Sequence, residues 1–341
     1  MLSKTVNIGL PLKLGKEDYT LKNISFPVLF AYLVIFVVWG STYFFIKIAV
    51  QSIPPLHLVG WRFMISGLLL LSFSFFTGRI RRMPTLRELA ASAILGVLLL
   101  AGGNGLVSLA EKKVDSYVAA LILAATPLFV AVFDRVLLRK HLSVLAWIGI
   151  LFGVSGVGFL MYPGNKLNVG FSPSMVLVVC ALVSWSLATS LGHRIRVYPD
   201  SFVNSGIQML VVGIGMSLIG FGLHPVTLTM ISGFTLPSLL SFLYLAIIGC
   251  SGFVAYTYLV QVEPAIRVVS YTFVNPIIAI LLGMLIGKEK ATPFLGFAIP
   301  TILIGLFLMV YGNTLMGRLQ PSRFKAGSVT DAIVPDDTEV G

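Results

Sequence analysis

The chain of 341 residues is 57% apolar and only 11% charged, and its mean hydropathy is +0.96. Soluble domains are roughly 45–50% apolar and about 25% charged, so this chain has too few charges to cover a water-exposed surface. The composition excludes a soluble enzyme, and it excludes general disorder, which requires low hydrophobicity. The net charge of +11 lies mostly in short stretches between apolar runs, which is typical of membrane topology signals and not of a nucleic-acid-binding face. We therefore expect an integral membrane protein without a nucleic-acid partner.

A helix needs roughly 20 apolar residues to cross the hydrocarbon core of a bilayer, and ten segments meet this length. The connections between them are short and rich in Pro, Gly, Asn and charge, as turns require. The expected fold class is therefore all-α integral membrane with ten transmembrane helices. In chain order, the spans are predicted at residues 28–50, 57–77, 88–110, 114–136, 143–162, 173–193, 201–222, 236–258, 264–287 and 293–312.

The loops predict the orientation, because Lys and Arg accumulate on the cytoplasmic side. If residues 1–27 form a cytoplasmic tail, sixteen of the 24 Lys and Arg lie on the cytoplasmic side and five lie outside. The other three, Lys47, Arg62 and Arg267, fall within spans. We therefore expect both termini to be cytoplasmic in a multi-pass protein of the cell (inner) membrane. Residues 313–341 are polar and are expected to form a disordered tail.

The spans divide into two halves of five, residues 28–162 and 173–312, that show weak internal similarity. Trp39 and Trp185 each stand in the middle of the first span of their half. Because each half crosses the membrane an odd number of times, the second half must enter from the opposite side. Inverted repeats are typical of secondary transporters, whose substrate site lies at the repeat interface.

The fourth span of each half contains a proline, Pro127 in the first and Pro276 in the second. Each ring removes one N–H group and clashes with the carbonyl four residues earlier, which opens the helix. A matched pair of helix breakers predicts hinges for a moving helix, with a permanent bend as the alternative. The freed carbonyls, those of Leu123 and Thr272, are expected to find partners on neighbouring helices or in cavity water.

Several stretches of the two halves resemble a known family. They are residues 39–43 (WGSTY), 102–105 (GGNG), 126–129 (TPLF), 274–276 (VNP) and 287–289 (GKE). Over about residues 28–312 the chain is similar to EamA-type members of the drug/metabolite transporter superfamily. The resemblance implies a ten-helix inverted-repeat carrier that exports amino acids, other metabolites or toxic compounds. The chain departs from the family pattern at Arg139-Lys140, where a Gly-Glu pair is common.

Uncharged polar and aromatic residues near mid-depth are the candidates for a solute cavity, because no span has an acidic residue near its centre to relay protons. Aromatic faces hold apolar or cationic ligands, and a few polar groups orient them. The alternative for each residue is helix packing, and we expect about half to face the cavity. The candidates are Trp39, Thr42, Tyr43, Asn104, Trp185, Tyr256, Tyr271 and Asn275.

Four charged residues, Lys47, Arg62, Glu263 and Arg267, are candidates for a pathway or gate. Lys47 either extends to the membrane interface or lines the pathway. Arg62 is expected to cap carbonyls or tie helices together, with a pathway role as the alternative. Glu263 and Arg267 have the i, i+4 spacing of a helical ion pair, which could also close an inner gate.

The sequence therefore favours a secondary transporter that moves a small metabolite, amino acid or drug-like solute, in the export direction, by alternating access. The alternatives are a channel or uncoupled facilitator, and a non-transport membrane protein. Neither a metalloprotease motif nor a nucleophile elbow occurs, so we predict no catalytic residue, no metal and no cofactor. The expected partners are the solute and membrane lipid. Gly149 and Gly153 have the spacing of a close-packing face, either within the chain or in a homodimer.

Overall fold

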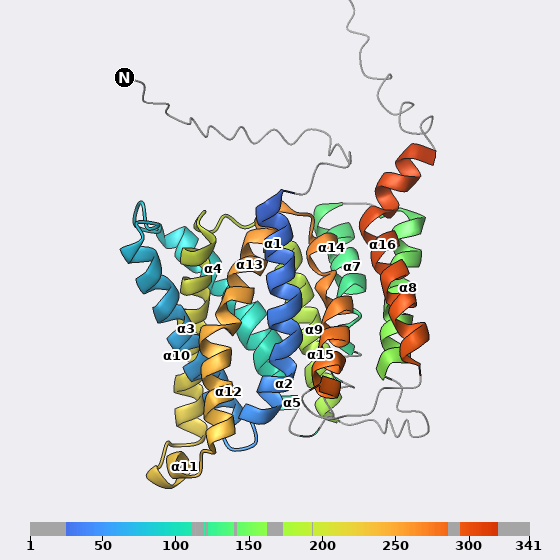
Figure 1. Ribbon diagram of the computed structural model, residues 1–341. Helices are drawn as coiled ribbons and strands as arrows, with labels where there is room; N and C mark the ends of the chain where they lie inside the picture. The colour runs from blue at the N-terminus through green and yellow to red at the C-terminus, as the bar shows by residue number, and fades with distance from the viewer. Residues whose placement is uncertain are drawn as a thin grey trace, which may run out of the picture.

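The computed structural model describes residues 25–110, 113, 119, 122–139, 142–161, 173–192, 194–285 and 294–319 (Figure 1). These residues form helices and turns. The helices of the first half are α1 (Phe26–Val34), η1 (Ile35–Trp39), α2 (Gly40–Ala49), α3 (Pro55–Phe76), α4 (Leu86–Gly96), η2 (Val97–Gly105), α5 (Leu106–Ala110), α7 (Thr126–Leu138) and α8 (Val144–Met161). Those of the second half are α9 (Pro173–Gly192), α10 (Ser201–Leu223), α11 (Leu228–Ser232), α12 (Leu236–Ile247), α13 (Gly249–Val262), α14 (Ala265–Val268), α15 (Tyr271–Leu285) and α16 (Leu295–Leu319).

Within the described ranges, seven helical stretches are long and apolar enough to cross a membrane. They are Phe26–Ala49, Pro55–Phe76, Leu86–Ala110, Pro173–Gly192, Ser201–Leu223, Leu236–Val262 and Gly296–Met316. Two shorter apolar helices, Val144–Phe159 and Ala265–Ile278, correspond to the predicted spans 143–162 and 264–287. The predicted span 114–136 lies partly outside the described residues, and α7 is its described part.

Two of the long helices contain π-helical segments that the sequence pattern did not predict. The first span passes from α1 through η1 into α2, and the third passes from α4 through η2 into α5. Trp39 is the last residue of η1, and Asn104 lies near the end of η2. π-turns inside α-helices are frequent at functional sites. Trp39 and Asn104 are therefore candidates for such a site.

Both prolines of the fourth spans lie near an interruption. Pro127 lies in the first turn of α7, where its missing N–H costs nothing. The Thr126 hydroxyl donates to the Leu123 carbonyl at 2.5 Å, so one carbonyl predicted to be free has a partner. Pro276 lies inside α15, and a two-residue turn separates α15 from α14. The turn at residues 124–125 lies between Leu123 and Pro127, where the proline ring is predicted to open the helix. In contrast, α15 continues through Pro276 without an interruption at that ring.

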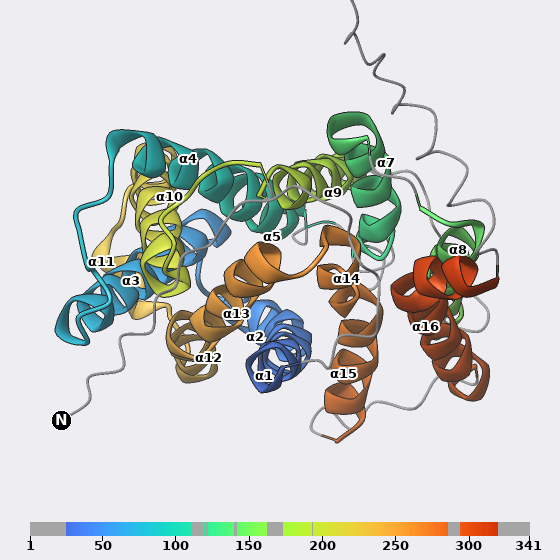
Figure 2. The ribbon, with the colours of Figure 1, turned by 90° about the horizontal axis from the view of Figure 1, so that it is seen from above.

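Two pairs of helices pack closely at opposite ends of the molecule, α3 against α10 and α8 against α16 (Figures 1 and 2). Glycines allow this approach: a Cβ atom at Gly67 would lie 2.5 Å from the Leu210 nitrogen, and one at Gly149 would lie 2.3 Å from the Met309 nitrogen. A Cβ atom at Gly305 would lie 2.4 Å from the Gly153 nitrogen, and one at Gly153 would lie 2.4 Å from the Phe273 ring. The Gly149/Gly153 face is therefore an internal packing surface that α16 and the Phe273 ring of α15 occupy, and it is not free for a homodimer.

The helix α16 continues to Leu319, past the predicted end at residue 312, so residues 313–319 are helical and the predicted disordered tail began too early. The extension has a local cause. The Asn313 side chain accepts a hydrogen bond from the Ser143 backbone N–H at 2.7 Å, where α8 is about to begin. The end of α16 thereby satisfies an N–H group near the start of its partner. The remaining tail residues, 320–341, and residues 1–24 lie outside the described ranges.

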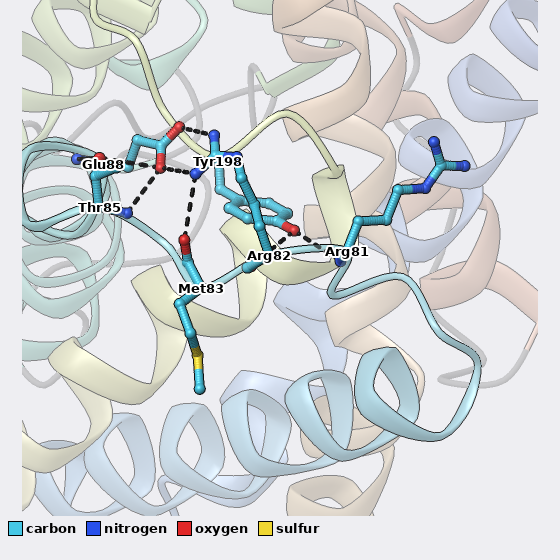
Figure 3. Close-up of polar contacts among 6 residues, drawn as sticks. All are labelled: Arg81, Arg82, Met83, Thr85, Glu88 and Tyr198. Atoms are coloured by element: carbon cyan, nitrogen blue, oxygen red, sulfur yellow. Dashed lines mark hydrogen bonds and ion pairs between the residues drawn. The ribbon is translucent and has the colours of Figure 1, made fainter.

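A polar cluster joins two loops (Figure 3) on the face of the molecule where α1 begins (Figure 1). The Tyr198 hydroxyl accepts a hydrogen bond from the Arg81 N–H at 3.1 Å and donates to the Arg82 carbonyl at 3.3 Å. The Arg82 guanidinium pairs with Glu88 through two hydrogen bonds, which raise the pKa of Arg82. Glu88 also completes a capping box with Thr85 at the start of α4. The loop between α3 and α4 is thus held against the loop between α9 and α10.

Candidate solute-binding cavity

Five aromatic side chains meet in the middle of the helix assembly, with the Trp39 ring at their centre. The centroid of the Trp39 ring lies 5.5 Å from those of Trp185 and Phe253, 5.2 Å from that of Tyr256, and 5.0 Å from that of Tyr271. Distances of this size are typical of favourable edge-to-face and offset ring contacts. We call these five residues the aromatic cluster.

Two glycines make room for the indoles of the aromatic cluster. A Cβ atom at Gly252 would lie 2.6 Å from the Trp39 ring, and a Cβ atom at Gly103 would lie 2.5 Å from the Trp185 ring. Gly252 belongs to α13 and Gly103 to η2. Each tryptophan therefore lies on the bare backbone of a helix from the other half of the chain.

A cavity of about 90 Å³ lies beside the aromatic cluster, with space for several water molecules. Its walls come from both halves of the chain, including α2, α3, η2, α9, α13 and α15. Thr42 and Ile46 of α2 and Arg62 near the start of α3 line it. The cavity therefore lies between the aromatic cluster and the turn that joins α2 to α3.

The structure brings six of the eight predicted cavity residues to the walls of this cavity: Trp39, Thr42, Asn104, Trp185, Tyr271 and Asn275. Tyr256 is 1% exposed, and its hydroxyl lies 2.6 Å from that of Thr189. It lines a second, smaller cavity on the other side of the aromatic cluster. The side chain of Tyr43 lies outside the described residues.

The predicted pathway charges occupy three different places. Arg62 lines the cavity and is 7% exposed. Lys47 is exposed near the end of α2 and is not part of the cavity wall. Glu263 and Arg267 form an ion pair of 3.4 Å, although Glu263 lies just before α14 and not within it. This pair also lies away from the cavity wall.

Sequence reasoning missed several residues of the cavity wall, notably Phe253, Cys250, Ser108, Thr126 and Thr272. Thr126 had a usable signal, because it stands directly before Pro127 as Asn275 stands before Pro276. Phe253 had none, because apolar residues predominate in α13 and the rotation of this helix about its axis cannot be read from the sequence. Gly252 next to it makes the space that Trp39 fills.

A model of the EamA-like transporter family matches residues 26–162 and 172–311. The chain belongs to this family. Its curated relatives include the uncharacterized inner membrane transporter YedA of Escherichia coli (strain K12), 36% identical over 298 residues, or 85% of this chain and 92% of the relative. The uncharacterized transporter YvbV of Bacillus subtilis (strain 168) is 27% identical over 285 residues, or 83% and 88% of the two chains.

A solved crystal structure of a protein 19% identical in sequence has the same fold, with a TM-score of 0.68 over 86% of this chain and 99% of that chain. The EamA-like chain is therefore a membrane transporter, and it has helices of membrane-crossing length to match. The family match and the transporter names of the relatives point to a role that is not enzymatic. The described residues of the cavity wall of this EamA-like transporter offer one guanidinium, two carboxamides, hydroxyls and aromatic faces. Such a wall can bind and orient a small solute without chemical change.

Proposed function

We propose that the protein is a secondary transporter that exports a small metabolite, amino acid or drug-like solute by alternating access around the cavity beside Trp39. The observation that carries the proposal is the position of the aromatic cluster between two cavities. One cavity contains Arg62 and Asn275, and the second contains Gln208 and Tyr256. A side-chain barrier between two cavities is what one end state of an alternating-access cycle requires.

The helix contacts support a fold of ten spans in two inverted repeats, residues 28–162 and 173–312. Helices at equivalent places in the two halves pack on each other, as α3 does on α10 and α8 on α16. Other contacts come in matched pairs: η2 packs on α9 as α12 packs on α2, and α7 packs on α9 as α15 packs on α2. If each helix is replaced by its counterpart in the other half, the same pattern of helix contacts results. This is the pattern expected of two repeats related by a two-fold axis.

The ends of the first and last helices support a common side for the two termini. In Figure 1, α1 begins and α16 ends at the same face of the molecule. The bias of Lys and Arg assigns this face to the cytoplasm. With that orientation, the cavity beside Trp39 lies toward the outside and the second cavity lies toward the cytoplasm. The structure then corresponds to an outward-directed state in the inner membrane.

The cytoplasmic side carries a buried polar path that a solute would meet before the aromatic cluster. Asn204 bonds Ser92 at 2.7 Å and Gln208 at 3.2 Å, and Ser205 donates to Thr257 at 2.8 Å. Polar side chains inside a membrane are costly unless they pair or face water. This network supports a route that hydrates when the aromatic cluster separates.

We propose the segments around Pro127 and Pro276 as the moving parts. Each follows a short interruption, and residues beside each proline, Thr126 and Asn275, line the cavity. A displacement of α7 or α15 would therefore change the cavity wall directly. None of the described residues of the wall is acidic, so proton coupling through a carboxylate there is not part of the proposal.

Counterflow separates a carrier from a channel or uncoupled pore. A metabolite-wide uptake screen first identifies a solute, and liposomes that contain the purified protein are preloaded with it. These liposomes should take up labelled solute even when the total solute concentration is equal on both sides of the membrane. Preloading should accelerate this uptake, because a carrier exchanges solute for solute. Uptake that preloading leaves unchanged would indicate a channel, and no uptake of any solute would contradict the transport proposal.

A further inference from the structure

We infer that Arg62 forms an anion-binding site in the cavity and that the solute carries a single carboxylate. The inference rests on the proposed function, because it assumes that the cavity beside Trp39 is the solute site. Arg62 is 7% exposed, lies in a membrane-length helix, and is part of the cavity wall. A cation in such a place is rare and marks a functional position by default.

The guanidinium of Arg62 has weak protein partners. One terminal nitrogen donates to the Asn104 carboxamide oxygen at 3.4 Å, which is long for a hydrogen bond, and the group lies 4.3 Å from the centre of the Phe63 ring. Its Nε atom is buried and has no hydrogen-bond partner. In the part of the chain that the structure describes, Arg62 takes part in no ion pair. These contacts leave the positive charge uncompensated.

A bound carboxylate would supply what Arg62 lacks. The planar guanidinium presents N–H groups in a fork that matches two carboxylate oxygens. The indole Nε1 of Trp185 is a second buried donor without a partner, and the Asn275 carboxamide oxygen is a buried acceptor without one. Both residues line the same cavity as Arg62. The unpartnered polar atoms of the wall therefore fit a solute with an acidic group and a separate hydrogen-bond donor.

The rest of the wall limits the class of anion. Arg62 is the one cation among the described wall residues, so it balances one negative charge and leaves a dianion such as a phosphate monoester uncompensated. Aromatic and aliphatic side chains, including Trp39, Phe253 and Leu245, form much of the remaining surface. This surface fits an apolar or aromatic body on the carboxylate.

The first test changes the ligand and leaves the protein intact. Wild-type protein in nanodiscs is titrated with phenylacetate and isovalerate, and then with phenylacetamide and isovaleramide, which keep shape and lose charge. Quenching of tryptophan fluorescence reports binding, because Trp39 and Trp185 line the cavity. At least one acid should bind about tenfold or more tightly than its amide, the scale of a charge-assisted hydrogen bond. Equal binding of acid and amide, or binding of neither acid, overturns the inference.

The second test changes the protein. Arg62→Gln should remove the difference between acid and amide, and Arg62→Lys should restore part of it because the charge is kept. Arg196→Gln, which neutralises an exposed loop arginine, is the matched control and should bind as wild type does. Acid binding by Arg62→Gln at wild-type strength contradicts the inference even if the ligand test succeeds.

The outcomes for the site and for transport can be told apart. Arg62-dependent acid binding without counterflow would leave the anion site standing and contradict the carrier. Counterflow of a neutral or cationic solute, with no preference for acids, would leave the carrier standing and contradict the anion site.

Discussion

Trp39 and Trp185 lie edge to face, with ring centroids 5.5 Å apart and ring planes at 76°. Trp39 lies in the first long helix of the first half of the chain and Trp185 in the first helix of the second half, so the contact joins the two halves. Each indole also lies on a glycine of the opposite half, Trp39 on Gly252 and Trp185 on Gly103. This reciprocal arrangement holds the barrier between the two cavities at the place where the halves meet.

We predict that a methyl group at either of these glycines disrupts the aromatic cluster. In Gly252→Ala and Gly103→Ala, the new Cβ atom would meet an indole at 2.6 or 2.5 Å, and overpacking of this kind costs about 1–3 kcal/mol. Both variants should unfold at lower temperature and transport more slowly. Gly215→Ala is the matched control, because its Cβ atom would have nothing within 4 Å. Wild-type melting and flux in both variants would show that the indoles move aside freely.

We predict that the double variant Pro127→Ala/Pro276→Ala transports more slowly while it keeps its ligand affinity in one conformation. Alanine restores the missing N–H groups and favours a continuous helix, which should hinder rearrangement at the two interruptions. The single-turnover rate in liposomes and the dissociation constant in nanodiscs should be measured separately. Transport at the wild-type rate would mean that the prolines only shape the helices.

We predict that the Tyr198 hydroxyl protects the loop between α3 and α4 from proteases. Tyr198→Phe removes the hydrogen bonds to the Arg81 N–H and the Arg82 carbonyl and leaves the buried ring in place. Trypsin should then cleave after Arg81 or Arg82 several times faster than in wild type, because cleavage requires local opening. Tyr258→Phe serves as the control. Equal cleavage rates in all three proteins would show that other contacts hold the loop.

The orientation gives a further prediction. A reporter enzyme that is active only outside the cytoplasm, fused after residue 319 at the end of α16, should be silent, and a cytoplasmic reporter at the same place should be active. The reason is the excess of Lys and Arg in the segments assigned to the inside. The reverse result would invert the proposed orientation and place the cavity beside Trp39 toward the cytoplasm.

The helical membrane architecture was predictable because long apolar runs have few other stable structures. The relation between Trp39 and Trp185 was also visible, since both stand in the middle of a first span. The Glu263–Arg267 ion pair followed from its spacing, although the Pro264 turn places Glu263 outside the helix. Local spacing and hydrophobicity are sufficient for features of this kind.

The details of the cavity depend on rotations and windings that the sequence does not encode locally. The π-helical segment η1 shifts the residues around Trp39 about the helix axis, and no simple periodicity reveals it. Tyr256 has the depth of a cavity residue but points to the opposite side of the aromatic cluster from Asn275. The sequence favoured a packing role for Arg62. Its Nε atom lacks a hydrogen-bond partner, and this is apparent only in the three-dimensional structure.

The glycine contact between α8 and α16 also has a consequence for biosynthesis. Gly149 and Gly153 of α8 are covered by Gly305 and Met309 of α16, which the ribosome makes about 150 residues later. At about 5–20 residues per second, this delay is roughly 8–30 s. During that interval the glycine surface of α8 faces lipid or another inserted protein. The first half of the chain therefore remains incompletely packed in the bilayer until the last helix is synthesised and inserted.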